Sequence, residues 1–222
     1  MLIAGIDEAG RGPVIGPLVI AIVAIRPEKE RELLNIGVKD SKLLSPVTRG
    51  ILYNQIVELV DRYEIAVIDA NEVDSALKDP NSNLNKLEAK TASNLIVASK
   101  ADKVYVDCPT TKTYLFKSYL TTYLSKLKYT NVDIISEHKA DLNYPVVSAA
   151  SILAKVTRDS LIEEMKRDYN VDFGSGYTSD PLTQKFINSH WENPKYSKII
   201  RKNWETFKRL KSSKSQTSLK SY

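Results

Sequence analysis

The chain has 222 residues, of which 42% are hydrophobic and 27% charged, and its formal net charge is +5. This composition is typical of a soluble globular protein, and no apolar run reaches the length of a membrane span. The only cysteine, Cys108, excludes an intramolecular disulfide and a cysteine-rich zinc site. Because the sequence also opens without a basic-then-apolar leader, we expect a cytoplasmic protein of a reducing compartment.

The positive charge is concentrated at the C-terminal end. Residues 195–222 contain nine Lys or Arg and one acid, Glu205, whereas the rest of the chain has 23 basic and 26 acidic residues. A basic tail of this kind indicates a polyanionic partner, most simply nucleic acid. Its last part, residues 212–222, is rich in Ser and Lys, and we predict that it is a disordered, solubilising terminus.

Two adjacent carboxylates, Asp7 and Glu8, follow a short apolar stretch at residues 2–6 that is typical of a buried strand. Neighbouring buried carboxylates repel, so they must be neutralised by a proton, a base or a metal ion. Mg²⁺ and Mn²⁺ are the ions that prefer carboxylate oxygens. The alternative is a hairpin that carries an acidic pair on the surface.

A glycine-rich segment follows the carboxylates directly. Gly10 and Gly12 allow the backbone to approach a ligand closely, and Arg11 between them can reach a phosphate. The spacing to Gly16 is one residue too wide for a dinucleotide-binding fingerprint. Residues 14–25 favour a returning strand instead of a helix, and no phosphate-binding G-K-[ST] sequence is present.

The next part of the chain predicts a phosphate-binding loop before a helix. Residues 26–38 form a charged connection, and Ser45 with Pro46 is a strong helix start. The preceding Asp40-Ser41-Lys42 places a hydroxyl and a lysine where they can hold a phosphate. A solvated loop is the equal alternative.

A second strand-end carboxylate lies in the middle of the chain. Strands are predicted at residues 63–69 and 104–107, with a helix between them over 82–99. The second of these strands ends in Asp107, and ligands bind at the carboxyl ends of strands in open α/β sheets. Asp107 is therefore a candidate metal ligand, although a lone Asp at such a place is often a cap.

A third polar cluster follows a helix at residues 114–126 and a strand at 132–136. It contains Glu137, His138, Lys139 and Asp141, and a helix with small residues then starts at Ser148. A flexible loop over residues 174–181 presents the ring of Tyr177, and short helices are expected at 184–191 and 199–210. Together these elements predict one α/β domain with mixed strands and a basic helical extension.

The order and spacing of these motifs resemble the ribonuclease HII family, the type 2 ribonucleases H, particularly the single-chain archaeal form. The resemblance spans nearly the whole chain. It rests on the segments Asp7-Glu8-Ala9-Gly10-Arg11-Gly12-Pro13, Asp40-Ser41-Lys42-Leu43, Val106-Asp107, Glu137-His138-Lys139-Ala140-Asp141, residues 148–159 and Gly176-Tyr177.

This resemblance implies a ribonuclease H-like α/β fold, with a five-stranded mixed sheet flanked by helices. Residues 1–187 would form the catalytic domain, 188–211 a basic helical extension and 212–222 the disordered tail. The implied activity is hydrolysis of RNA in RNA–DNA hybrids. It includes cutting 5′ to single ribonucleotides in duplex DNA, with 5′-phosphate and 3′-hydroxyl products, as in ribonucleotide excision during DNA replication and repair.

The resemblance also implies roles for individual residues. Two Mg²⁺ or Mn²⁺ ions, about 4 Å apart, would be held by four carboxylates. Gly10, Arg11 and Gly12 would read the ribose 2′-hydroxyl, Tyr177 would stack on the sugar at the RNA–DNA junction, and Lys42 is a candidate phosphate contact. The four implied catalytic and metal-binding residues are Asp7, Glu8, Asp107 and Asp141.

Two other functions compete with this prediction. A different nuclease of the same fold, such as a DNA resolvase, would not need Tyr177 or the glycine segment as ribose readers. A non-catalytic nucleic-acid-binding module would not need four carboxylates, which weaken simple phosphate binding. We therefore expect a monomeric ribonuclease, in which His138 is structural rather than catalytic and the substrates are RNA–DNA hybrids and ribonucleotide-containing DNA.

Overall fold

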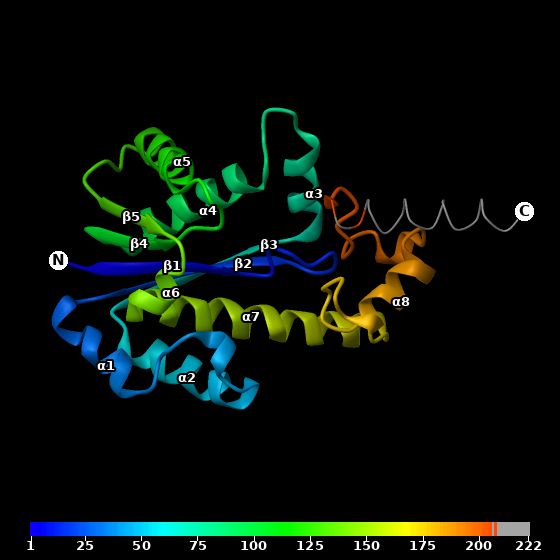
Figure 1. Cartoon of the computed structure of the whole chain (residues 1–222), viewed down its shortest axis with the longest axis horizontal. Helices are drawn as coiled ribbons and strands as arrows, with labels where there is room; N and C mark the ends of the chain where they lie inside the picture. The colour runs from blue at the N-terminus through cyan, green and yellow to red at the C-terminus, as the bar shows by residue number, and fades with distance from the viewer. Residues whose placement is uncertain (206, 208–222) are drawn as a thin grey trace, which may run out of the picture. The chain divides into compact units, whose positions relative to one another are not determined.

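A computed structural model describes residues 1–205 and 207 of the chain (Figure 1). These residues divide into two compact units. Unit 1 comprises Met1–Ala9, Val19–Val67 and Asn85–Asp159, and unit 2 comprises Gly10–Leu18, Ile68–Leu84 and the residues from Ser160 onward. No helix within the described ranges is long and apolar enough to cross a membrane.

Unit 1 is built on a mixed sheet of five strands in the order β3-β2-β1-β4-β5. The central strand β1 pairs antiparallel with β2 and parallel with β4, and β4 pairs parallel with β5. All eight residues of β2 are buried, as expected for an apolar strand inside a sheet covered on both faces. The strands are β1 Ile3–Ala9, β2 Leu18–Ile25, β3 Arg62–Ile68, β4 Lys103–Asp107 and β5 Asp133–Glu137.

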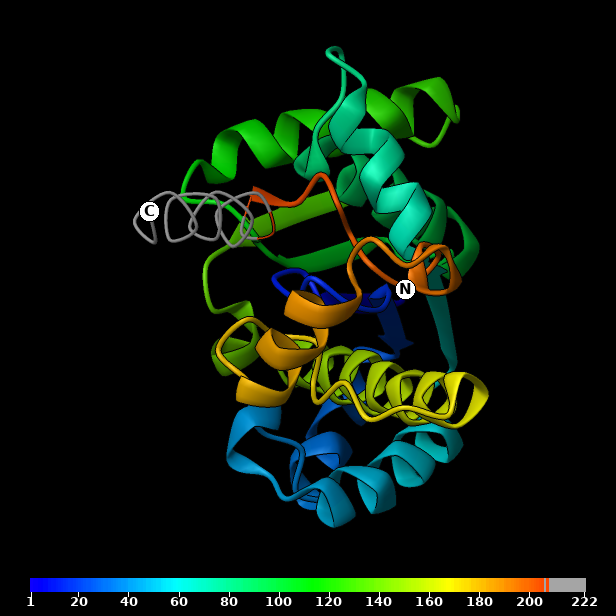
Figure 2. The ribbon, with the colours of Figure 1, turned by 90° about the vertical axis from the view of Figure 1, so that its right-hand side faces the viewer.

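Helices cover both faces of this sheet, which confirms the predicted fold class (Figures 1 and 2). In both views α4 (Leu84–Ser99) and α5 (Thr113–Lys126) lie on one face. The long helix α7 (Pro145–Tyr169) lies on the other, with α1 (Glu30–Asn35) and α2 (Pro46–Leu59) beyond it. Crossover helices of this kind are what parallel strand pairs require.

The start of α7 touches the backbone of the central strand at Gly5. A Cβ built on Gly5 would lie 2.3 Å from the backbone carbon of Val146 and from the nitrogen of Val147. Real Cβ atoms do not approach backbone so closely, so only glycine fits at this position. The contact sets α7 directly against β1, next to the strand end that carries Asp7.

Unit 2 has a core of its own. Ile15 forms an isolated antiparallel bridge with Ile200, and the same cluster buries Phe173 and Phe186. Its helices are α3 (Ala70–Lys78) and α8 (Pro181–His190), and a 3₁₀ turn, η3, spans Pro194–Tyr196.

Several elements differ from the predicted ones. The charged connection at 26–38 contains η1 (Pro27–Lys29) and α1. Helix α3 was not predicted; Asp69 is its N-cap, and the Asp69 side chain accepts a hydrogen bond from the Glu72 N–H. Helix α7 begins at Pro145 and not at Ser148, because proline is well suited to a first helical turn. The helix predicted at 199–210 is wrong at its start, because Ile200 pairs with Ile15 in a β-bridge and residues 201–204 are turn or irregular. Most of the rest of that predicted helix, and the tail at 212–222, lie outside the described residues. The division into 1–187 and 188–211 stays a prediction.

Candidate active site

Three of the four predicted carboxylates lie together in unit 1. Asp7 is at the end of β1 and Asp107 is the last residue of β4; these strands are parallel neighbours with Ile6 opposite Val106. Asp141 lies in the short helix α6 (Ala140–Asn143) that follows β5. Asp7 and Asp141 are only 6% and 4% exposed, so their charges interact through little water.

The burial of Asp7 changes its acidity. Desolvation first, and then the neighbouring charges of Asp107 and Asp141, together raise the pKa of its carboxyl from 3.8 to about 7. Hydrogen bonds from the Ser151 hydroxyl and the Glu8 N–H oppose this rise; the Glu8 nitrogen is 2.7 Å from Asp7 Oδ1. Glu8 itself is half-buried, and its role as a metal ligand stays a prediction.

Asp107 connects the strand end to the helix that carries Asp141. Its Oδ1 accepts a hydrogen bond of 2.9 Å from the Ala140 N–H, at the start of α6. Burial raises the pKa of Asp107, this hydrogen bond lowers it, and the charge of Asp141 raises it again, with a net increase. This hydrogen bond to the first residue of α6 places Asp141 beside Asp107.

Two serines hold Asp7 in place, and one of them is Ser41, whose hydroxyl was predicted to help hold a phosphate but is buried against Ser151. Ser151, on α7, donates to the Asp7 carboxyl, and its Oγ lies 3.0 Å from Ser41 Oγ. Since the proton of Ser151 points to Asp7, Ser41 donates to Ser151. Both serines are buried. The pair connects the loop before α2, through α7, to the end of β1.

Lys42 supplies positive charge to this carboxylate cluster. Its Nζ lies 3.8 Å from Asp141 Oδ2, and its side chain is 81% exposed. Burial lowers the pKa of Lys42, but the charges of Asp141, Asp40, Asp7 and Asp107 outweigh this and raise it. Lys42 lies in a 3₁₀ turn, Ser41–Leu43, and its N–H donates to Asp40 Oδ1. The residue is therefore charged, accessible and beside the carboxylates.

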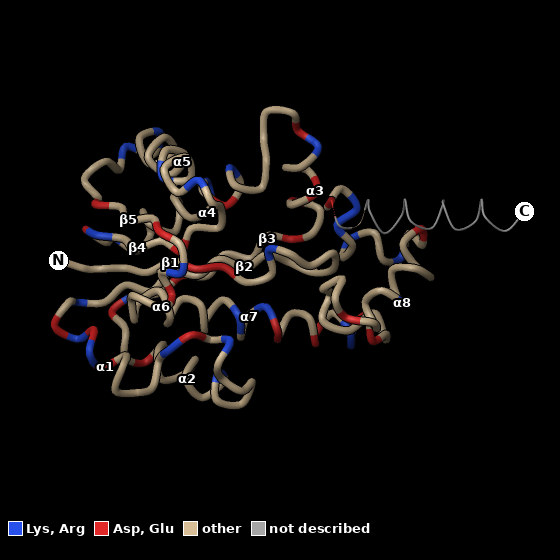
Figure 3. The backbone as a smooth tube through the Cα atoms, in the orientation of Figure 1, with Lys and Arg blue, Asp and Glu red and all other residues tan. Residues whose placement is uncertain are grey.

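The donor set of this cluster fits a hard divalent cation. Its side chains offer only oxygen ligands, and they carry more negative charge than Lys42 can offset. In Figure 3, acidic and basic positions adjoin around β1 and α6. Among the described residues, however, no three His, Cys, Asp or Glu side chains are arranged to ligate one ion as they lie. Metal binding at Asp7, Glu8, Asp107 and Asp141 therefore stays a prediction.

The raised pKa of Asp7 predicts an inverted pH dependence of stability without metal. The folded state holds a proton on Asp7 up to about pH 7, whereas the unfolded chain releases it near pH 3.8. Because the folded state binds more protons in this window, stability falls as pH rises, by at most about 1.4 kcal/mol per unit. Urea unfolding in EDTA at pH 5 and pH 7.5 measures this. The Asp7→Asn variant should lose this decrease, and an equal decrease in both proteins would contradict the assignment.

His138 and Glu137 occupy structural positions beside the cluster. The Nδ1 of His138 lies 3.2 Å from the Cys108 carbonyl oxygen, so the ring connects the ends of β4 and β5. The Tyr144 hydroxyl donates to Glu137, which raises the pKa of Tyr144 to about 12, and its ring stacks on Tyr105. These contacts support the prediction that His138 is structural.

Unit 2 brings the two predicted ribose-reading segments together. The carbonyl oxygen of Gly176 accepts hydrogen bonds from Val14 N and Ile15 N, at 2.9 and 3.3 Å. A Cβ on Gly12 would lie 3.7 Å from Cε1 of Tyr177. Gly10 has a φ of 85°, a conformation that favours glycine. The glycine segment and the Tyr177 ring therefore form one surface.

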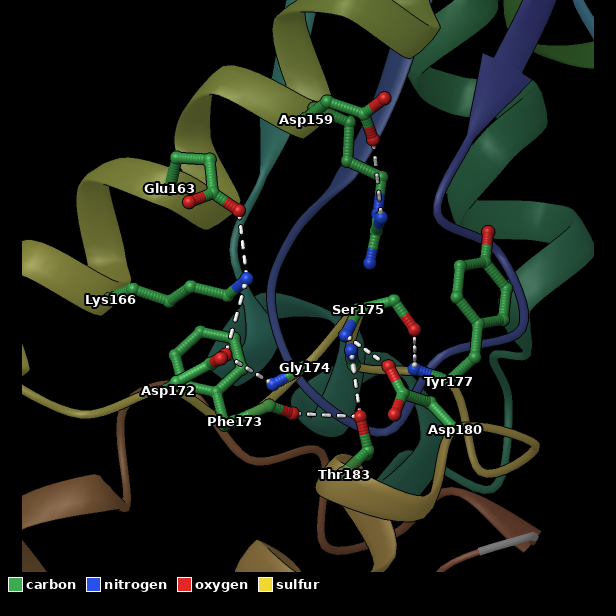
Figure 4. A network of polar contacts seen from close by, with 12 residues as sticks. Asp159, Glu163, Lys166, Asp172, Phe173, Gly174, Ser175, Tyr177, Asp180 and Thr183 are labelled. Atoms are coloured by element: carbon green, nitrogen blue, oxygen red, sulfur yellow. Dashed lines mark hydrogen bonds and ion pairs between the residues drawn. The ribbon is translucent and has the colours of Figure 1, made fainter. Parts of the chain in front are cut away.

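The loop that carries Tyr177, predicted to be flexible, is held by a network of hydrogen bonds (Figure 4). The N–H of Gly174 donates to Asp172, and that of Ser175 to Asp180. Thr183, which is fully buried, accepts from Gly176 N at 3.0 Å and donates to the Phe173 carbonyl at 2.8 Å. No sequence pattern predicted this network, although Asp180 before Pro181 is a recognisable N-cap.

The five-stranded mixed sheet flanked by helices, with carboxylates at its strand ends, is a ribonuclease H-like fold. The profile of the family "Ribonuclease HII" matches residues 4–207. The chain therefore belongs to the ribonuclease HII family, whose members are endoribonucleases that act on RNA–DNA hybrids. Enzymes of this family depend on divalent metal ions.

Individual relatives agree with this assignment. Ribonuclease HII of Pyrococcus furiosus is 42% identical over 226 aligned positions, covering 99% of this chain and 97% of the relative. The crystal structure of ribonuclease H2 from Pyrococcus horikoshii superposes with a TM-score of 0.81 at 39% identity, over 96% of this chain and 98% of that one. An Archaeoglobus fulgidus ribonuclease HII, solved in complex with PCNA, gives the same TM-score at 36% identity over 92% and 96%.

Proposed function

We propose that this ribonuclease also cuts duplex DNA on the 5′ side of a single embedded ribonucleotide. Water attacks the phosphorus, the bond to the upstream 3′-oxygen breaks, and the products are a 3′-hydroxyl and a 5′-phosphate. The observation that carries the proposal is the cluster of Asp7, Asp107 and Asp141, in which Asp7 and Asp141 are buried and Asp107 is half-buried. Such a cluster is costly unless it serves a cation-dependent reaction.

The proposed cation ligands are these three carboxylates together with Glu8. When bound there, Mg²⁺ or Mn²⁺ would supply charge neutralisation and an activated water for phosphoryl transfer. The chain itself contributes the orientation of the ligands. Ser151 and the Glu8 N–H hold the Asp7 carboxyl, and the Ala140 N–H holds Asp107. Fixed oxygens lose less entropy when a cation binds than mobile ones would.

Lys42 is proposed to contact a phosphate of the substrate. It is charged, exposed and 3.8 Å from Asp141, so its ammonium can exchange this weak partner for a phosphate oxygen. The carboxylate cluster repels the phosphates of the substrate, and a nearby positive charge such as the Lys42 ammonium reduces this repulsion when little metal is bound. Lys42 thereby supports binding without taking part in bond cleavage.

Gly10, Arg11, Gly12 and Tyr177 are proposed to recognise the ribose. The 2′-hydroxyl is the only group that distinguishes RNA from DNA at one nucleotide, and backbone N–H and C=O groups can bond to it. A Cβ built on Gly12 would lie 3.7 Å from the Tyr177 ring, which offers an apolar face to a sugar. This role is supported by the hydrogen bonds from Val14 N and Ile15 N to the Gly176 carbonyl, which join the glycine segment to the loop that carries Tyr177.

Other properties of the enzyme are proposed from the composition alone. We propose a cytoplasmic monomer whose basic C-terminal residues add affinity for nucleic acid. Both rivals are less well supported. A non-catalytic binding module gains nothing from buried carboxylates that repel phosphate, and a DNA resolvase has no need of a ribose-reading segment.

The decisive experiment uses a labelled DNA duplex that carries one ribonucleotide, beside an RNA–DNA hybrid and an all-DNA duplex. With Mg²⁺ or Mn²⁺ we expect one cut, 5′ to the ribonucleotide, and none in EDTA. Ligation of the products identifies the 3′-hydroxyl and 5′-phosphate ends. Cleavage of the hybrid without cleavage of the single-ribonucleotide duplex would refute the proposal and leave the family activity intact.

A further inference from the structure

A fully buried arginine in unit 2, Arg201, binds the carbonyl groups of the glycine segment. Its Nη1 donates to the Arg11 carbonyl oxygen at 3.1 Å, and its Nε donates to that of Gly16 at 2.9 Å. Its backbone N–H donates to the Val14 carbonyl at 2.8 Å. One residue from the C-terminal part of the chain thus holds the carbonyl of Arg11, in the segment proposed to read the ribose, and two carbonyls directly after that segment, those of Val14 and Gly16.

The neighbouring Trp204 completes this arrangement. Its indole Nε1 donates to the Gly12 carbonyl oxygen at 3.0 Å. Consecutive carbonyl groups, those of Arg11 and Gly12, therefore each have a fixed donor. Since Pro13 has no N–H, the peptide group between Gly12 and Pro13 can be held only through its carbonyl.

These two bonds restrain the conformation of Gly12. A peptide group is planar, so a bond to its oxygen limits how the whole plane can turn. The planes on both sides of the Gly12 Cα are held in this way, which narrows the φ and ψ range that glycine otherwise has. In a trans peptide the N–H points opposite to the C=O. The Gly12 N–H is consequently directed away from Arg201.

The attachment of the C-terminal segment does not itself require Arg201. The Ile15–Ile200 bridge, the hydrogen bond from Gly16 N to the Ile199 carbonyl and the apolar cluster around them already join the two segments. A buried guanidinium is costly compared with an apolar side chain of similar volume. The hydrogen bond from Arg201 to the Arg11 carbonyl lies outside the Ile15–Ile200 bridge. A residue that only attached the C-terminal segment would not need this bond.

We propose that Arg201, assisted by Trp204, is a positioning residue for ribose recognition. It orients the Arg11–Gly12 peptide so that the enzyme prefers a 2′-hydroxyl over a 2′-hydrogen. The inference rests on the proposed function, in which the glycine segment contacts the ribose. It adds the residues that make this segment rigid enough to discriminate between two sugars that differ by one hydroxyl.

The test compares Arg201→Met, Arg201→Lys and Trp204→Phe with the wild type. For each protein kcat and KM are measured on the single-ribonucleotide duplex, and Ki is measured for the all-DNA duplex of the same sequence as a competitor. The matched control is Lys198→Met, which removes one exposed positive charge from the same segment. Circular dichroism and urea unfolding give the folded fraction of each variant.

We expect Arg201→Met to lower kcat/KM by about 10- to 100-fold, the effect of one or two charged hydrogen bonds, with Ki changed less than about twofold. Trp204→Phe, which retains an aromatic ring, should lower kcat/KM by about fivefold. Arg201→Lys should restore part of the loss because it keeps one donor. Lys198→Met should change KM and Ki by the same factor.

Equal changes of KM and Ki in the Arg201 variants, or a loss that follows only the folded fraction, would overturn the inference. If the Arg201 variants do not fold, Trp204→Phe still tests the inference, because it removes only one hydrogen-bond donor at a half-buried site. If the wild type cuts hybrids but not the single-ribonucleotide duplex, the proposed function fails. The same comparison on the hybrid then still decides whether Arg201 favours ribose.

Discussion

Replacement of Asp7 by asparagine should lower the rate of cleavage by about 10³-fold or more while the protein stays folded. Asparagine has the shape of aspartate but not its charge, so it can accept only part of the hydrogen bonding that Asp7 receives from Ser151 and Glu8. At pH 7.5 without metal, its free energy of unfolding should equal or exceed that of the wild type. The reason is that Asp7 is buried beside Asp107 and Asp141, where a negative charge is unfavourable.

This opposite effect on activity and stability separates a catalytic role from a structural one. The measurements are single-turnover cleavage and urea unfolding of the same preparations. Asp133→Asn is the matched control, since Asp133 is exposed and its ion pair with Lys103 is 3.6 Å long. It should change the rate less than about twofold and stability by less than about 0.5 kcal/mol. If the Asp7→Asn variant cleaves at the rate of the wild type, Asp7 is not a catalytic residue.

Replacement of Gly5 by alanine should destabilise the protein by about 3 kcal/mol or more, the effect of severe overpacking. The added methyl group would lie 2.3 Å from the backbone of Val146 and Val147, and backbone cannot move aside as a side chain can. Either β1 or the start of α7 must shift. Since α7 carries Ser151, which holds Asp7, we also expect the folded variant to cleave more slowly.

Gly50→Ala is the matched control for Gly5→Ala. Gly50 lies inside α2, and a Cβ there would meet nothing within 4 Å. Alanine is the better helix former, so this variant should be more stable by roughly 0.5–1 kcal/mol. Denaturant unfolding of both variants in one buffer measures the difference. If Gly5→Ala is as stable as the wild type, α7 does not pack on β1 as described.

Local sequence patterns predicted most of the secondary structure. Alternating turn residues and apolar runs gave the antiparallel pair β1 and β2, and the Ser45-Pro46 signal placed the start of α2 correctly. They did not reveal α1 or α3, which are short and bury only Leu33 and only Ala70 and Val73, respectively. A helix of two turns has too few buried positions for its periodicity to stand out.

The candidate site was only partly visible in the same patterns. The strand-end rule identified Asp7 and Asp107, because each directly follows buried apolar residues. The assignment of Asp141 as a ligand depended on the family resemblance, since a helix of one turn after a strand has no distinctive periodicity. Its proximity to the other two carboxylates comes from the hydrogen bond between Asp107 and Ala140.

The sequence by itself determined the strands and the longer helices in their chain order, the acidic strand ends and the family to which the chain belongs. All of these depend on residues that are close together in the chain or on motifs in a fixed order. Only the tertiary structure decided that Ser151 holds Asp7, that Gly5 admits α7 and that Arg201 binds the carbonyl of Arg11. Each of these contacts joins residues far apart in the chain, so its partners are set by packing and hydrogen-bond geometry and leave no local periodic signal.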